Sequence, residues 1–376
     1  MLVKEMCRRT AIAALLMFSA SPVRMFAEHT LASREFFFIG GKYEGPPETV
    51  VMAGQMYVEV LRPQLITRKY PLIFFHGNRN TAVYWTGTPD GRAGWADYFL
   101  SQGYIVYLVD QPARGRSAYH ASINGPVNIE PAYNYEWRVT ATEAFAKWPQ
   151  AKNHTQWPGH GDKKGRRGDP NFDAFYASIV PALVSDVETQ KLVRDAGVAL
   201  LDRIGPAILV THSQAGPFGW LLADARPKLV KAIVAVEPNG PPFQNEITNK
   251  NRARQWGITD APLTYYPSID AASDLKTVRE QDADGPDLVT CWKQDDPPRQ
   301  LLNLRGIAIL IVTTEASYHA AYDHCTAKYL TQAGVNNEFM RLEDHAIHGN
   351  GHFPMIERNN IEIATLLNRW ITGHVK

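Results

Sequence analysis

Ser213 lies at the end of an apolar run, in the sequence Ile-Leu-Val-Thr-His-Ser-Gln-Ala-Gly over residues 208–216. A serine that follows a buried strand and is flanked by small residues is typical of the sharp strand-to-helix turn that presents a nucleophile. Such turns need small residues two positions before and after the serine, because larger side chains would collide. Those positions hold Thr211, which departs from the usual glycine, and Ala215. Residues 217–225 can form the helix behind the turn.

A serine hydroxyl is a weak nucleophile at neutral pH and needs a neighbouring base, usually a histidine. His352 is the best candidate, because it follows a Gly-Asn-Gly loop and precedes Pro354, which would begin a helix. We interpret the nearby His345 and His348 as residues that bond to loop backbone or line the site. The spacing of the three histidines is not that of a helical His-Glu-x-x-His motif, so we expect no zinc site.

The histidine in turn needs a carboxylate that holds its tautomer and stabilises its cation. Glu237 follows the apolar run 232–236, and its Glu-Pro-Asn-Gly turn would leave the carboxylate at the edge of the sheet where catalytic groups gather. Glu315, after the next apolar run, is the alternative, and either carboxylate could merely cap a turn. We favour Glu237. Asp110 also ends an apolar run, and we assign it a structural hydrogen-bonding role.

An attacked acyl carbonyl becomes an oxyanion that needs two hydrogen-bond donors. We expect the backbone N–H of Gln214, directly after the nucleophile, to be one of them. The second donor is expected to be the backbone N–H of Asn78, in the His76-Gly77-Asn78 turn after the apolar run 71–75. The glycine would let the backbone bend toward the site, although a plain strand-ending turn is the alternative.

Apolar runs of the fully buried kind alternate with helical patterns, which predicts a parallel sheet with right-handed crossovers, preceded by two antiparallel strands. The expected strands are 34–43, 55–61, 71–75, 104–110, 207–211, 231–236, 307–313 and 338–342, and the expected helices are 94–102, 217–225 and 354–370.

Two segments interrupt this alternation, residues 118–172 and 239–304. Both are far longer than ordinary connections of about 2 to 6 residues. We interpret them as cap insertions on a single domain of residues 28–376. The first insertion is rich in aromatic residues, which fits either a wall over a pocket or a small satellite core. These aromatic residues include Tyr133, Tyr135, Trp137, Trp148 and Trp157.

The composition fits a globular protein, because 45% of the 376 residues are hydrophobic. The 39 basic and 38 acidic side chains give a formal net charge of +1, so no long-range field would attract nucleic acid or acidic membranes. The basic cluster at residues 163–167 lies among glycines without apolar periodicity and is interpreted as a solvated loop.

The first residues have the layout of an export signal, with basic residues before an apolar run from Ala11 to Ala20. The sequence predicts a signal peptide within residues 1–27, cleaved after Ala20 or Ala27. The paired arginines before the run also fit a twin-arginine signal, and a non-exported amphipathic leader is the alternative. The run is shorter than the roughly 20 apolar residues that cross a bilayer. We therefore expect a secreted or periplasmic protein without a membrane span.

Of the three cysteines, Cys7 would leave with the signal peptide. Cys291 and Cys325 would remain, and one disulfide between them is consistent with an exported protein. Two buried thiols are the alternative, because sequence spacing does not fix the distance between the two sulfur atoms.

On these motifs the chain resembles the α/β-hydrolase fold superfamily, of the serine esterase and lipase type. The motifs are His76-Gly77-Asn78, Asp110 with Arg114-Gly-Arg-Ser117, Thr211-His-Ser-Gln-Ala215 and Gly351-His352. The turns after Glu237 and before His352 are similar to those of secreted microbial esterases whose acid follows the sixth strand instead of the seventh. The resemblance implies a mostly parallel central sheet flanked by helices, the chain order serine, acid, histidine, and no cofactor.

Together these observations predict a carboxylic ester hydrolase with a triad of Ser213, His352 and Glu237, which would form an acyl-enzyme that water then releases. The backbone amides of Asn78 and Gln214 would hold the oxyanion. The aromatic insertions favour a moderately hydrophobic or aromatic ester, or a lactone, as the small-molecule substrate. An amidase or peptidase with the same triad, and a ligand-binding protein without turnover, are the alternatives.

Overall fold

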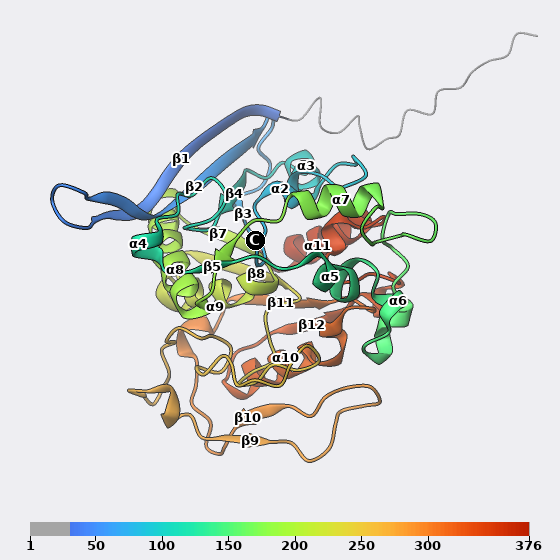
Figure 1. Cartoon of the computed structure of the whole chain (residues 1–376). Helices are drawn as coiled ribbons and strands as arrows, with labels where there is room; N and C mark the ends of the chain where they lie inside the picture. The colour runs from blue at the N-terminus through green and yellow to red at the C-terminus, as the bar shows by residue number, and fades with distance from the viewer. Residues whose placement is uncertain (1–30, 376) are drawn as a thin grey trace, which may run out of the picture.

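The computed structural model describes residues 31–375, so the expected export signal and Cys7 lie outside the described residues. A central sheet of eight strands has the order β1-β2-β4-β3-β7-β8-β11-β12 (Figure 1). The antiparallel strands are β1 (Leu31–Glu44) and β2 (Val51–Pro63), and β2 also pairs antiparallel with β4 (Val106–Asp110). The strands that continue the sheet in parallel are β3 (Leu72–Phe75), β7 (Ala207–His212), β8 (Val230–Val236), β11 (Ala308–Thr313) and β12 (Glu338–Arg341).

Most residues of β3, β7, β8 and β11 are apolar and buried because both faces of the sheet are covered there, whereas the edge strand β12 is partly exposed. In β3, Ile73 and Phe75 enter one hydrophobic core, whereas Leu72 and Phe74 enter the other. The first core is completed by α8 (Asp186–Ile204), α9 (Gly216–Ala225) and α10 (Asp323–Gln332), and the second by α3 (Trp95–Ser101) and α11 (Asn360–His374). This is the α/β-hydrolase fold that the sequence predicts, and its mostly parallel sheet flanked by helices is confirmed.

All eight expected strands are present, but several helices differ from expectation: α8 and α10 are not among the predicted helices, and α11 begins later than predicted. The predicted helix 354–370 is wrong at its start, because a short 3-10 turn over Pro354–Ile356 is followed by extended backbone at Glu357. The carboxylate of Glu357 accepts a hydrogen bond from the backbone of Gly351, and α11 begins only at Asn360. No described helix combines the length and the apolar character that a bilayer crossing requires.

The longest helix, α8 with 19 residues, was not predicted. Its amino terminus nevertheless carries a recognisable signal, the sequence Ser-Asp-Val-Glu over residues 185–188. The Ser185 hydroxyl accepts a hydrogen bond of 3.1 Å from the backbone N–H of Glu188, which is half of a capping box. A search for caps, in addition to apolar periodicity, would have found this helix.

The two long segments contain short elements instead of a second sheet or bundle. The first holds α4 (Ala121–Asn124), β5 (Val127–Asn128), α5 (Ala132–Tyr135), a π-helical turn (Glu136–Thr140), α6 (Thr142–Phe145), a 3-10 turn (Pro149–Asn153) and the start of α7 (Pro170–Ala177). The second holds 3-10 turns at Ala272–Asp274 and Leu302–Leu304 and the hairpin of β9 (Thr277–Arg279) and β10 (Trp292–Gln294). The remaining short elements are α2 (Val83–Thr86), β6 (Ala182–Leu183) and the 3-10 turns at Ser213–Ala215, Tyr318–Ala321 and Leu342–His345.

The first segment folds together with residues beyond its predicted end, because β5 pairs with β6. Its aromatic residues do not form a separate satellite core: Tyr135 and Trp157 pack in the second core with Phe172, and Trp148 is also buried. Tyr133, by contrast, is exposed. The division of the chain into one domain with two cap insertions stays a prediction.

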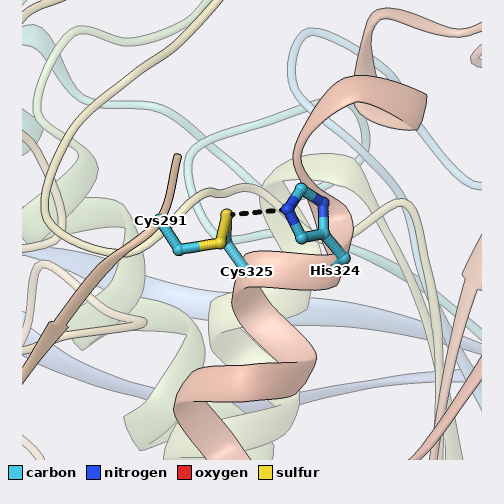
Figure 2. A group of neighbouring side chains, drawn as sticks. All are labelled: Cys291, His324 and Cys325. Atoms are coloured by element: carbon cyan, nitrogen blue, oxygen red, sulfur yellow. Dashed lines mark hydrogen bonds between the residues drawn. A yellow bond between two sulfur atoms is a disulfide. The ribbon is translucent and has the colours of Figure 1, made fainter. Parts of the chain in front are cut away.

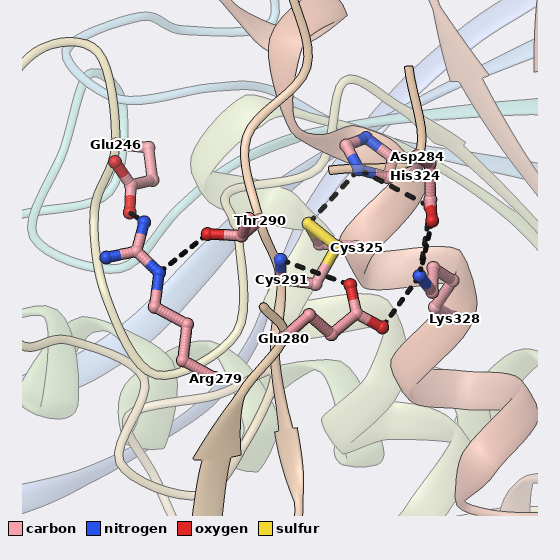
Figure 3. Close-up of a disulfide and its surroundings, with 9 residues drawn as sticks. All are labelled: Glu246, Arg279, Glu280, Asp284, Thr290, Cys291, His324, Cys325 and Lys328. Atoms are coloured by element: carbon pink, nitrogen blue, oxygen red, sulfur yellow. Dashed lines mark hydrogen bonds and ion pairs between the residues drawn. A yellow bond between two sulfur atoms is a disulfide. The ribbon is translucent and has the colours of Figure 1, made fainter. Parts of the chain in front are cut away.

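A disulfide joins Cys291, directly before β10, to Cys325 in α10, as Figure 2 shows. It therefore ties the second insertion to a helix that covers the central sheet. Ion pairs from Lys328 to Glu280 and Asp284 join the same two segments (Figure 3). His324 lies beside the two sulfur atoms, but these are bonded to each other and offer no thiolate to a metal ion.

Replacing both Cys291 and Cys325 with alanine should lower the free energy of unfolding by about 3–4 kcal/mol, because a closed loop no longer restricts the unfolded chain. The two cysteines are separated by 34 residues. Equilibrium denaturation of the variant and the wild type measures the difference. Peptide mapping of the non-reduced protein is the control, and free thiols at both positions would contradict the assignment.

Candidate active site

Ser213 occupies the turn between β7 and α9, with its backbone in the left-handed region at φ 56°. A non-glycine residue with this conformation is strained, and such strain is typical of a nucleophile turn. Thr211 is buried, and its Cγ2 faces Gly219 of α9, where an added Cβ would lie at the ordinary van der Waals distance of 3.4 Å. Ala215 supplies the small residue on the other side of the turn.

The three residues predicted as a triad lie together. His352 Nε2 is 3.0 Å from Ser213 Oγ, and His352 Nδ1 is 2.5 Å from Glu237 Oε2. Because a carboxylate can only accept, the hydrogen between them belongs to Nδ1, which leaves Nε2 free to accept from the serine. Glu237 directly follows β8, and His352 lies in the loop after β12, so all three side chains reach the carboxyl edge of the sheet.

Glu237 is completely buried, and several hydrogen-bond donors stabilise its carboxylate. The backbone N–H and the hydroxyl of Thr314 donate to Oε1 at 2.9 and 2.6 Å, and the hydroxyl of Ser317 donates to Oε2 at 2.7 Å. Burial raises the pKa of Glu237, and these hydrogen bonds oppose that rise. Burial lowers the pKa of His352, so the imidazole rests in the neutral form that can accept a proton.

The alternative acid, Glu315, does not contact His352 and instead bonds to the loop before it. Its Oε2 accepts a hydrogen bond of 2.8 Å from the backbone of Gly349 and lies 3.3 Å from Nδ1 of His348. His345 and His348 are exposed. Among residues 31–375, neither belongs to a group of side chains that could hold a metal ion. Glu315 and His348 thus hold the loop backbone at the surface.

A second histidine pair, which the sequence analysis missed, lies behind the first. The ring of His319 stacks on that of His352 with 4.7 Å between centroids, and its Nδ1 is 2.9 Å from Asp323 Oδ1. Burial lowers the pKa of His319 to about 4, so this ring is neutral at physiological pH. Glu237, His319 and His352 are close enough to share a metal ion, but His352 already faces Glu237 and Ser213 with its two nitrogens.

A chain of hydrogen bonds connects the two loops on either side of Ser213. The backbone N–H of Gly77 donates to the Tyr84 hydroxyl at 2.7 Å, and this hydroxyl lies 3.1 Å from Nδ1 of His212. His212 Nε2 then donates to the backbone carbonyl of His352 at 2.8 Å. Burial lowers the pKa of His212, which keeps the ring neutral with one donor and one acceptor. The sequence analysis assigned no role to Tyr84 or His212.

The predicted oxyanion residues, Asn78 and Gln214, line one cavity with Ser213 and His352. A glycine at position 77 favours the close approach of their two loops, because a Cβ there would make tight contacts of 3.1 Å with Ser213 Cβ and His212 Nδ1. Which backbone N–H groups bind an oxyanion stays a prediction.

A buried arginine holds these two loops at a fixed distance. Arg114 Nη1 donates to the Gly77 carbonyl and to Oε1 of Gln214, both at 3.2 Å. Burial lowers the pKa of Arg114 to about 10, so the guanidinium stays charged at neutral pH. The neighbouring Asp110 accepts hydrogen bonds from the backbone of Ala82 and from Arg116, which is the structural role expected of it.

The cavity in front of Ser213 has a volume of about 210 Å³, and both long segments contribute to its wall. Tyr135 and Arg138 come from the first segment, and Glu246 and Arg254 from the second. Glu246 is held by Arg279 of β9, as Figure 3 shows. Charged and amide groups lie beside the tyrosines, so the wall is more polar than the aromatic composition of the segments suggests.

The loop that carries His352 is also fixed by a buried ion pair network. His154, from the first segment, lies with Nε2 2.7 Å from Glu357 and with Nδ1 3.1 Å from Glu143. Glu357 accepts the backbone N–H of Gly351 at 3.0 Å, directly before His352. Burial alone would lower the pKa of His154, but the two carboxylates raise it to about 9, so His154 is a buried cation at neutral pH.

Comparisons with known proteins point in one direction. Residues 72–366 match the model of the alpha/beta hydrolase family. A probable secreted lipase, phiG, of Fungal sp. (strain ATCC 74256) is 47% identical over 337 residues, which cover 89% of this chain and 88% of the lipase. The solved structure of a novel bacterial esterase superposes with a TM-score of 0.62 at 24% identity, covering 92% of this chain and 97% of the esterase.

Ser213 should react with a fluorophosphonate probe, and the Ser213→Ala variant should not be labelled. Glu237→Gln should slow labelling at least about 100-fold, because an amide cannot stabilise the imidazolium that forms. Glu315→Gln is the matched control and should label at the wild-type rate. The measurement is the second-order labelling rate by mass spectrometry, and a slow Glu315→Gln with a fast Glu237→Gln would make Glu315 the acid.

His154 should make stability depend on pH. Its folded pKa lies above the unfolded value of about 6.5, so its contribution is complete below pH 6.5 and is lost as the pH rises through about 9. His154→Gln should therefore reduce the free energy of unfolding by at least about 1 kcal/mol more at pH 6 than at pH 10. Urea denaturation at both pH values tests this, with the exposed His348→Gln as control. An equal loss at both pH values would exclude the buried cation.

Proposed function

The chain belongs to the alpha/beta hydrolase family, and from this premise we propose that it is a serine hydrolase that cleaves carboxylic esters through an acyl-enzyme. The observation that carries the proposal is the unbroken series of contacts from Glu237 through His352 to Ser213. A serine next to a neutral imidazole, itself held by a buried carboxylate, is the arrangement that makes a hydroxyl reactive at neutral pH.

In the proposed reaction His352 Nε2 takes the hydroxyl proton of Ser213 as the serine oxygen attacks the ester carbonyl. The imidazolium that forms is stabilised by Glu237 and then donates its proton to the leaving alcohol. Water, activated by the same nitrogen, attacks the acyl-serine and releases the acid. The hydroxyl of Tyr318, which lies 3.3 Å from His352 Nε2, borders the position of the leaving alcohol.

We further propose that the backbone N–H groups of Asn78 and Gln214 bind the oxyanion. Support comes from the position of both residues beside Ser213 in the cavity and from Arg114, which holds their loops together. Donors fixed before the reaction stabilise the developing charge without having to reorganise, and one such donor contributes about 3–4 kcal/mol to a transition state.

Three further expectations belong to the same proposal. The two long segments act as a cap, which their contribution to the cavity wall supports. The substrate carries a hydrophobic or aromatic portion, or is a lactone, and the rings of Tyr135, Tyr318 and Phe353 in the wall offer surfaces for it. The protein is exported, in keeping with the secreted lipase that it resembles at 47% identity.

The ester should be preferred over an amide. An ester and an anilide with the same acyl group should differ at least about 100-fold in kcat/KM, because an amide carbonyl is less electrophilic than an ester carbonyl and its amine is a poorer leaving group than an alcohol. Ser213→Ala should lower kcat for the ester by at least about 10⁴-fold. Mass spectrometry after rapid quenching should find the acyl group on Ser213.

Comparable rates on the two substrates would support an amidase. An absence of turnover on both, with fluorophosphonate labelling intact, would support a binding protein with a reactive serine. The Arg226→Gln variant serves as control, because Arg226 lies in an exposed ion pair with Asp202, outside the cavity.

A further inference from the structure

Three arginines from three separate segments meet in the wall of the cavity that contains Ser213. Arg79 follows the predicted oxyanion residue, Arg138 comes from the first long segment, and Arg254 comes from the second. Guanidinium groups stay charged at neutral pH and are costly to cover with protein unless an anion or a set of oxygen acceptors compensates them. The acceptors among residues 31–375 compensate the three arginines to different degrees.

Arg254 and Arg79 are compensated within the protein. The buried Arg254 donates to the Pro241 carbonyl at 2.6 Å and to Asn245 Oδ1 at 2.7 Å. Arg79 forms a 2.9 Å ion pair with Glu130 and also donates to Asn128 at 2.6 Å. The terminal nitrogens of these two side chains are thus already used.

Arg138 is different. Its one ion pair among the described residues is to Glu130, at 3.7 Å, and Glu130 already pairs more closely with Arg79. No hydrogen bond joins the Arg138 guanidinium to another described residue, whereas the terminal nitrogens of Arg79 are bonded; the Nε of both side chains is buried without a partner. The side chain keeps 24% of its surface exposed, so the remaining nitrogens are accessible. One carboxylate, Glu130, therefore serves two arginines, and a positive charge is left at the cavity.

The acidic residues of the cavity do not neutralise this charge. Glu246 pairs with Arg279 and accepts a hydrogen bond from Gln244. Asp186 also lines the cavity, where it accepts a hydrogen bond of 3.0 Å from Gln214 Nε2, and it forms no ion pair with Arg138.

The Arg138 guanidinium is held in a defined place. Its centre lies 6.0 Å from the ring centroids of both Trp137 and Tyr318, and the Tyr318 hydroxyl is 3.3 Å from His352 Nε2. Aromatic faces stabilise a cation and orient its planar fork without using its donors. Arg138 therefore presents its donors near the imidazole, on the side where an alcohol would leave.

We propose that Arg138 binds a carboxylate carried by the substrate, so that the site selects anionic esters over neutral esters of the same size. The proposal rests on the proposed ester hydrolase function and adds the charge of the substrate to it. A guanidinium fork pairs with a carboxylate through two parallel hydrogen bonds, which gives the interaction direction as well as charge. The position of Arg138 favours a carboxylate on the alcohol portion.

Two matched pairs of esters test the proposal on the purified protein. The first pair is the butanoyl ester of 3-hydroxybenzoate and that of 3-hydroxybenzamide, which differ only in charge on the alcohol portion. The second pair is the monoethyl ester of glutaric acid and its neutral terminal amide, which differ in charge on the acyl portion. In at least one pair the anionic ester should have a kcat/KM at least about tenfold higher, mainly through a lower KM, and we expect this for the first pair.

The ratio of anionic to neutral kcat/KM should fall at least about tenfold in Arg138→Gln, and Arg138→Lys, which keeps the charge but loses the fork, should give an intermediate ratio. Arg226→Gln should keep the wild-type ratio. Thermal unfolding of each variant verifies that it is folded. A wild-type ratio near one for both pairs, or an unchanged ratio in folded Arg138→Gln, would overturn the proposal.

Binding to the Ser213→Ala variant separates this inference from the proposed function. Calorimetry should show at least about tenfold tighter binding of the anionic ester, and the double variant with Arg138→Gln should lose this preference. A preference in binding without any turnover by the wild type would retain the anion site and reject the ester hydrolase. Turnover of neutral esters without any preference in binding would support the ester hydrolase and reject the anion site.

Discussion

The arrangement of the site depends on one buried carboxylate. Glu237 has no contact with solvent, and an ionised carboxylate in that position would be strongly destabilising without donors. Thr314 and Ser317, from the segment that follows β11, supply these donors and leave the remaining lone pair for His352 Nδ1. The carboxylate therefore joins the ends of two neighbouring strands and the loop after a third, and the tautomer of His352 follows from this arrangement.

The loops around Ser213 are fixed from several directions at once. Tyr84 and His212 connect the backbone of Gly77 to that of His352, whereas Arg114 connects Gly77 to Gln214. None of these contacts involves the serine hydroxyl. They restrict the backbone instead, which suits a site that must hold its donors and base in place before a substrate arrives.

The sheet and the proposed triad were predictable because each rests on a local pattern. Buried strands are continuous apolar runs. Ser213 and Glu237 each directly follow one in a Gly- or Pro-containing turn, and His352 follows the Gly-Asn-Gly loop after the last strand. Helix α8 was missed because its apolar stripe is weak, and the late start of α11 was missed because it depends on a contact of Glu357 with Gly351. The roles of His154, His212 and Arg138 depend on residues far away in the chain, which no local pattern encodes. The positive charge of the cavity could not be predicted from the sequence for the same reason, because its arginines come from three segments that meet only in the folded protein.

The chain order of the site has a consequence during synthesis. His352 follows Ser213 by 139 residues and comes after the last strand, β12. A nascent polypeptide that has emerged as far as β11 already contains the serine and its carboxylate partner, but it lacks the imidazole. If the proposed reaction is right, incomplete or prematurely terminated products are inert toward cellular esters, and reactivity arises only when translation of the last segment is finished.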